Sequence, residues 1–422
     1  MLHRLILAQC SGFFEASTSQ EWSKATNEGG TEVARIGGES SSEAGRPGLR
    51  EPKMRWRYEL DTGPQSDDIP MLVQKDAHTS TFFAMNDSNR PPPVRNKPPP
   101  SQNGFFRSVA NLNLVPTRTS PELSQEDEDL LRDYDNLFRI FYNYPPVLDA
   151  INIADAYIQS KALLTLADMY DALPVVGPRI DHHLLQFQSR LWKQIAKYPP
   201  SYLKLGYMAR SKVIFTEALI HVVGQWPVGE RHLRNSLPEN VLELIEDKVD
   251  ELLETVLKID QKLFRLTLLT SRGERVTPAN NYLDWLVISL FRQWLVDNTT
   301  RVSVPPKSSP RRGSNPSSRP PLPAAPVALS QLGRVYRLIG SSNPSSYLNH
   351  DECKRFLKFT PDMYSRDSLK RFEKKLDELK AAAREIVKPL MRCGLQLEAG
   401  EGFGYLTCSK VSEEDFSWET ES

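Results

Sequence analysis

Between Ser124 and Pro227 the apolar residues recur every three or four positions, in runs that prolines separate. This spacing places them on one face of a helix and predicts four successive amphipathic helices. The first carries its apolar residues between Leu130 and Phe141, and Ser124 followed by an acidic run is typical of a helix start. The connections are short, so we expect neighbouring helices to pack as hairpins.

The limits of the next three helices follow from the same pattern. The second carries its apolar residues from Ile153 to Tyr170, the third from Ile180 to Leu191, and the fourth runs from Tyr202 to Val223. Prolines at 145–146 and 199–200 end the first and the third, because proline lacks the backbone N–H that a helix interior needs.

Two further helices are predicted after this region. Pro238–Thr270 has one apolar face and no glycine or proline inside it, and Tyr282–Val296 is the most apolar segment of the chain. A bilayer span needs about 20 apolar residues, whereas this segment is shorter and contains Asp284 and Arg292. We therefore interpret it as a buried helix.

Between Asp367 and Leu390 the apolar residues recur at steps of three and four, as in a heptad repeat, and form one stripe along the predicted helix. Such a seam can pair with another helix in a coiled coil, and a helix docked on its own bundle gives the same stripe. The candidate interaction surface on this helix consists of Leu369, Phe372, Leu376, Leu379 and Ile386.

Strand patterns are few. Met54–Leu60 alternates apolar and charged residues with the period of two that marks a half-buried strand, and Ile69–Gln74 is a second candidate, in which Pro70 favours an edge position. Leu395–Leu397 and Tyr405–Cys408, on either side of a glycine-rich stretch, predict a terminal hairpin. The expected fold class is α+β, mostly α-helical, with a small sheet.

Two separated segments together resemble a known family. Asp133–Leu185, with DYDNLFRIFYNYP, LLTLADMYDAL and HHLLQF in this order, is similar to the carboxyl half of the BTB/POZ domain, and Leu2–Ala16 is similar to the first helix region of that domain. With the helices that follow, the chain looks most like the BTB/POZ proteins of filamentous fungi. In the family, two or three strands precede the first helix, so the resemblance implies a degenerate unit truncated at the amino terminus.

The resulting domain organisation has four parts. We expect a BTB/POZ-like domain at 1–187, a helical extension at 188–302, a disordered linker at 303–328 and a helical region with the hairpin at 329–422. Residues 17–53 and 86–121 are rich in Ser, Gly, Pro or Glu and are expected to be disordered insertions.

Composition narrows the classes of partner. The chain has 53 basic and 53 acidic residues, so no global field draws it to nucleic acid or to an anionic membrane. Its four cysteines, in 422 residues, have no C-x-x-C spacing. This usage is typical of a reducing compartment, and we expect a cytoplasmic or nuclear protein.

The sequence contains no constellation that points to catalysis. Gly400–Gly404 lacks the spacing of a nucleotide loop, and the adjacent His182 and His183 point about 100° apart on a helix, so they do not share a metal. We expect no enzyme activity, catalytic residue, metal, cofactor or small-molecule ligand.

The resemblance instead implies a protein–protein interaction module, an adaptor or scaffold with protein partners that include self-association. The alternatives are a substrate adaptor of a cullin-based ubiquitin ligase, a transcriptional regulator, and an enzyme with an unrecognised site.

Overall fold

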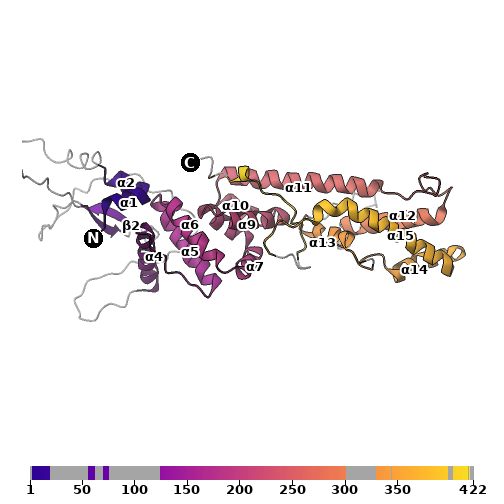
Figure 1. The fold of residues 1–422 in the computed structure, drawn as a ribbon, viewed down its shortest axis with the longest axis horizontal. Helices are drawn as coiled ribbons and strands as arrows, with labels where there is room; N and C mark the ends of the chain where they lie inside the picture. The colour runs from indigo at the N-terminus through magenta and orange to yellow at the C-terminus, as the bar shows by residue number, and fades with distance from the viewer. Residues whose placement is uncertain are drawn as a thin grey trace, which may run out of the picture. The chain divides into compact units, whose positions relative to one another are not determined.

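The computed structural model describes residues 2–19, 56–61, 70–75, 124–300, 329–343, 345–397, 403–416 and 418. These residues are mostly helical and include one two-stranded antiparallel sheet, which confirms the predicted fold class (Figure 1). The disordered segments predicted at 86–121 and 303–328, and all but the first residues of that at 17–53, lie outside the described residues.

The chain divides into two compact units. Unit 1 comprises Met1–Val147 and Gln159–Arg179, and unit 2 comprises Leu148–Ile158 and Ile180–Ser422. The elements that begin in the first half of the chain are α1 Arg4–Cys10, α2 Gly12–Ser17, β1 Arg57–Asp61, β2 Met71–Lys75, α4 Gln125–Phe141, α5 Ile153–Met169 and α6 Leu173–Leu185. α4 starts where the sequence predicts. The Ser124 hydroxyl caps it by accepting a hydrogen bond from the Asp127 N–H at 3.2 Å.

The two predicted strands form and pair with each other. β1 and β2 are antiparallel, with a register from Arg57 opposite Lys75 to Asp61 opposite Met71. Pro70 lies just before β2, as its missing N–H requires, and the predicted residues Met54 and Ile69 lie outside the described residues.

An aromatic core joins the sheet to the helices of unit 1. The ring of Phe14, which is 1% exposed, stacks on that of Tyr170 with centroids 5.6 Å apart. The Tyr170 hydroxyl lies 2.9 Å from that of Tyr134 and accepts a hydrogen bond from the Leu72 N–H at 2.7 Å. The Ser11 hydroxyl donates to the Tyr170 carbonyl at 2.5 Å. The segments around Phe14, Tyr134 and Tyr170 therefore share one core within unit 1.

The third and fourth predicted helices are each two helices, so the predicted boundaries are wrong there. α7 Ser189–Lys197 begins after Gln188, which has φ 47°, and Pro178 lies inside α6 instead of before it. The next pair is α8 Pro199–Met208 and α9 Lys212–Gln225, separated at Arg210 with φ 52°. The apolar spacing continues across both breaks, which is why the pattern did not reveal them.

Unit 2 contains the predicted long helix and the predicted buried helix. Its further helices are α10 Glu230–Arg234, α11 Glu239–Arg265, α12 Tyr282–Thr299, α13 Leu329–Gly340, α14 His350–Lys358 and α15 Arg366–Val387, with 3-10 turns at Pro361–Met363, Lys388–Met391 and Glu413–Asp415. α11 contacts both α9 and α15 (Figure 1). Val287 and Phe291 of α12 are 0% and 1% exposed, so one face of this helix is buried as expected, whereas Tyr282 and Val296 at the ends of the predicted segment are exposed.

The predicted terminal hairpin does not form. Among the described residues after α15 there is no strand, and a single backbone hydrogen bond joins the Gly394 N–H to the Thr407 carbonyl at 3.2 Å. Residues 392–397, 403–416 and 418, here called the C-terminal strap, lie instead against helices. The strap passes so close to α9 that a Cβ on Gly224 would lie 2.3 Å from the Leu406 carbonyl oxygen.

Candidate functional site

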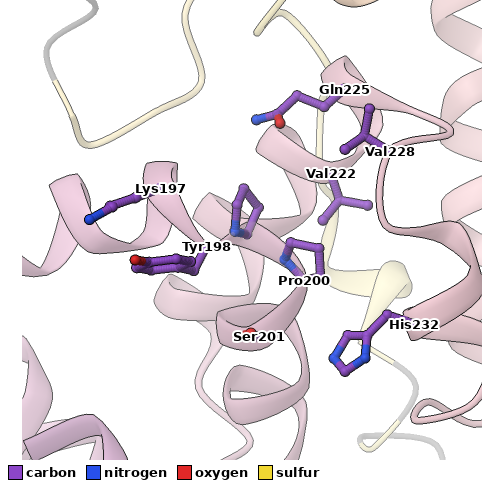
Figure 2. A pocket seen from close by; sticks show the side chains of 9 residues that line it. Lys197, Tyr198, Pro200, Ser201, Val222, Gln225, Val228 and His232 are labelled. Atoms are coloured by element: carbon purple, nitrogen blue, oxygen red, sulfur yellow. The ribbon is translucent and has the colours of Figure 1, made fainter. Parts of the chain in front are cut away.

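An open groove lies where α7, α8, α9 and α10 meet in unit 2. Figure 2 shows Lys197 and Tyr198 on one side of it, Val222, Val228 and His232 on the other, and Pro200 between them. The lining residues are Lys197, Tyr198, Pro199, Pro200, Ser201, Val222, Gln225, Val228 and His232. The groove is therefore built from the ends of helices, which are held in place by the hairpins between them.

Local backbone rules explain how these ends come together. Pro199 begins α8, a position where its missing N–H has no partner to lose. A cis peptide bond joins Trp226 to Pro227 after α9, and Gly229 follows with φ 85°. A Cβ on Gly229 would lie 2.8 Å from the Cγ of Pro200. Only glycine combines this backbone conformation with this close approach, so Gly229 sets α10 beside the start of α8.

The groove combines apolar surface with positive charge. Tyr198 is 49% exposed and Val228 is 60% exposed, whereas Val222 is buried beneath them. The Lys197 ammonium lies 5.0 Å from the centre of the Tyr198 ring, a cation–π contact. His232 adds an imidazole, and none of the lining residues is acidic. The site therefore favours a ligand that carries an apolar group and a negative charge.

The size of the groove limits what it can hold. Its volume is about 270 Å³, which is below the usual range of small-molecule pockets, and it is open on one side. A space of this size takes one or two side chains of an extended peptide.

One lining residue of the groove, Gln225, also contacts a buried polar cluster. The Gln225 side chain hydrogen bonds to the Tyr405 hydroxyl, which also lies 2.8 Å from Nδ1 of His221. The Glu217 carboxylate accepts hydrogen bonds from the backbone N–H groups of Gln396 at 2.7 Å and Leu397 at 3.1 Å. These bonds hold the strap on α9, behind the groove.

Burial sets the protonation of this cluster. It lowers the pKa of His221 to about 4, since the imidazole is 0% exposed. It raises the pKa of Glu217, and the two N–H donors of the strap oppose that rise. Nε2 of His221 lies 3.9 Å from the Glu217 carboxylate and has no hydrogen-bond partner within the described residues.

The candidate surface on α15 occupies a different place. Leu369, Phe372, Leu376 and Leu379 are buried, Phe372 completely, and Ile386 is partly exposed. α15 contacts α11, α12, α13 and α14, so this stripe packs within unit 2. Of the two interpretations of the stripe, docking on the chain's own bundle accounts for these four side chains.

The described residues contain neither a cluster of metal-ligating side chains nor a helix that could cross a membrane. No group of three or more His, Cys, Asp or Glu side chains is arranged to hold a metal ion. None of the helices within these residues has the length and apolar character needed to cross a bilayer.

His182 and His183 lie on α6, and the His183 ring bonds to the Asp149 carbonyl at 2.8 Å.

The groove residues were not among the sequence candidates. The available signals were Pro199–Pro200 and Gly229, which mark a helix start and a turn. Proline and glycine occur in the turns of most proteins, so they do not by themselves indicate a binding site. Only the fold brings Lys197 and His232 to the same groove, because they lie on different helices.

Comparison of the chain with protein-family models, with curated proteins and with solved structures finds no match.

Proposed function

We propose that this chain is a protein–protein interaction module, an adaptor that binds a short extended segment of a partner protein in the groove at α7–α10. The segment carries an aromatic or aliphatic side chain next to a carboxylate. The observation that carries this proposal is the lining of the groove, where exposed Tyr198 and Val228 lie with Lys197 and His232 and without an acidic residue.

The shape of the site supports a peptide over a metabolite. A partner's side chain covers Tyr198 and Val228 and is removed from water, while its carboxylate lies near the Lys197 ammonium. Enclosing one large apolar side chain contributes roughly 1.5 to 3 kcal/mol, and an exposed charge pair adds up to about 1 kcal/mol. Affinity of this kind suits reversible recognition.

Unit 1 supports the same class of function through its resemblance to the BTB/POZ domain. The two segments that carry the resemblance are distant in sequence, yet Gly12 donates its N–H to the Asp171 carbonyl at 3.2 Å and Phe14 packs on Tyr170. Such a shared core is what one interaction domain requires. We propose a degenerate BTB/POZ-like unit here.

The environment proposed for this module is the cytoplasm or the nucleus. All four cysteines, Cys10, Cys353, Cys393 and Cys408, are free. Free thiols throughout a chain of this length are typical of a reducing compartment.

A peptide-display selection tests the groove. A library of random peptides is selected on the immobilised full chain, and the enriched peptides are measured by fluorescence anisotropy. We expect peptides with an aromatic or aliphatic residue beside Asp or Glu, and binding at least about tenfold weaker to Tyr198→Ala, because the ring supplies much of the covered surface. Tyr144→Ala is the matched control, since Tyr144 is 60% exposed and does not line the groove. Enrichment of basic peptides, or equal loss in both variants, would overturn the proposal.

A further inference from the structure

A second pocket in unit 2 lies between α11, the 3-10 turn at Lys388–Met391 and the C-terminal strap. Its volume is about 290 Å³, and it shares no lining residue with the groove at α7–α10. Lys248 of α11 and Arg392 and Lys410 of the strap contribute basic side chains to its lining. Glu251 is the acidic residue among the described residues that line it. The pocket is therefore a local concentration of positive charge in a chain whose formal net charge is zero.

Lys248 is a fixed part of this pocket. The residue is 9% exposed, and its ammonium lies 3.0 Å from the Asp415 carboxylate. The Glu251 carboxylate lies 3.7 Å away, beyond hydrogen-bond length, on a side chain that is 65% exposed. A lysine ammonium has three N–H donors. Asp415 accepts one of them, so donors remain for a ligand in the pocket.

Arg392 and Lys410 come from the two arms of the strap. The hydrogen bond from the Gly394 N–H to the Thr407 carbonyl, at 3.2 Å, holds these arms side by side. Both basic side chains are exposed, and neither has a hydrogen-bond or ion-pair partner within the described residues. Two positive charges held at one pocket repel each other, and an anion between them replaces this repulsion by attraction.

We propose that this pocket binds a phosphate monoester, with the phosphate between Arg392 and Lys410 and one oxygen at the Lys248 ammonium. A phosphate monoester carries about −1.5 to −2 charges at pH 7, which matches two cations without a partner, whereas a carboxylate carries one charge. The guanidinium can donate two parallel hydrogen bonds to two phosphate oxygens. Leu252 and Pro389 form the apolar part of the lining, where the carbon that bears the phosphate lies.

The volume of the pocket limits the rest of the ligand. About 290 Å³ is just below the usual range for drug-sized molecules, so the pocket takes a phosphate with a few carbon atoms. A phosphorylated serine or threonine side chain and a small sugar phosphate both present this group. Because the ligand contacts α11 and both arms of the strap, its binding holds these segments together and stabilises unit 2.

Isothermal titration calorimetry of the full chain with inorganic phosphate tests the pocket, with sodium chloride at equal ionic strength as the reference. Inorganic phosphate lacks the carbon part, so we expect a dissociation constant on the order of 1 mM. Phosphate should also raise the midpoint of thermal unfolding, and chloride should not, because only a bound ligand stabilises the folded chain in this way.

Charge and shape variants locate the binding. Arg392→Gln and Lys410→Gln each remove one exposed cation, and each is expected to weaken phosphate binding at least about fivefold. Lys388→Gln is the matched control, because its ammonium pairs with Glu385 at 3.3 Å and does not line the pocket, so binding stays unchanged. Thr255→Trp fills the pocket without changing the net charge and is expected to abolish binding. Circular dichroism confirms that the variants are folded.

Two further ligands distinguish the sources of the phosphate. A short alanine peptide with a central phosphoserine is compared with its unphosphorylated form, and glycerol phosphate is compared with glycerol. Tighter binding of the phosphopeptide assigns the pocket to a modified protein, and tighter binding of glycerol phosphate assigns it to a small metabolite. Either result supports the proposal, provided that the form without phosphate does not bind.

Three results would overturn the proposal. The first is phosphate that binds no better than chloride at equal ionic strength. The second is an equal loss of binding in Lys388→Gln and Arg392→Gln, which would show a general effect of surface charge. The third is full phosphate binding by Thr255→Trp, which would place the anion outside this pocket.

Discussion

Nδ1 of His221 lies 2.8 Å from the hydroxyl oxygen of Tyr405, 184 residues later in the chain. Both groups are buried, and the Tyr405 hydroxyl also bonds to Gln225, a lining residue of the groove. The C-terminal strap therefore supports the groove from behind. Changes in the strap are expected to affect both the stability of unit 2 and the binding of a peptide.

The first prediction concerns pH. Burial lowers the pKa of His221 from 6.5 to about 4, so between these values the unfolded chain binds a proton that the folded chain excludes. His221 therefore makes the free energy of unfolding fall as the pH drops through this window, by up to about 3 kcal/mol. The raised pKa of Glu217 acts in the opposite direction, because the folded chain then binds a proton more readily than the unfolded chain.

The contribution of His221 is isolated by comparison with His221→Gln, which keeps Glu217 and removes the imidazole. Urea unfolding at pH 7 and at pH 4.5 gives the free energy of unfolding of both proteins. The unmodified chain is expected to lose more stability than the variant on acidification. Equal losses would show that His221 is protonated in the folded chain.

The second prediction concerns the close approach of strap and helix. Gly224→Ala puts a methyl group 2.3 Å from the backbone oxygen of Leu406, which cannot move without displacing the strap. We expect a loss of about 1 to 3 kcal/mol, the usual cost of overpacking. Gly394→Ala is the control, because its Cβ would meet first the flexible Cδ1 of Ile220, at 3.0 Å, and its cost should be smaller. Thermal unfolding measures both, and an equal effect would contradict this description of the strap.

The third prediction concerns α5. Leu164 is 0% exposed, and Leu164→Ala is expected to lower the free energy of unfolding by about 2 to 5 kcal/mol, as for other core truncations. Ile158→Ala, on the same helix and 62% exposed, should change it by less than about 1 kcal/mol. Chemical denaturation compares the two, and a cost below about 0.5 kcal/mol for Leu164→Ala would place that side chain in water.

Much of the fold was predictable because local rules decide it. The Ser124 cap fixes the start of α4, and the alternation around Tyr58 gives β1. The breaks at Gln188 and Arg210 were not predictable, because each depends on a positive φ at a residue that is not glycine, and the apolar spacing continues through it. Tertiary packing decides such positions.

The candidate site was harder to predict than the fold. The α15 stripe from Leu369 to Leu379 was recognised, but its spacing is the same whether the covering helix belongs to this chain or to another. The groove is lined by residues of four different helices, such as Lys197 at the end of α7 and His232 on α10, and only the tertiary fold brings these helices together. The hairpin expected around Tyr405 does not form, because a single backbone hydrogen bond joins its two arms and Tyr405 bonds instead to α9 and α13.

The most direct test of the interaction function is the dissociation constant of a selected acidic peptide for Lys197→Glu. Reversing this charge turns an attraction of about 1 kcal/mol into a repulsion, so binding should weaken by about tenfold or more at low ionic strength and by less at high salt. Lys193→Glu is the matched control, because Lys193 is exposed on the same helix and does not line the groove. Weakening in Lys197→Glu alone is the predicted result, and unchanged binding in that variant would contradict the groove as the site of recognition.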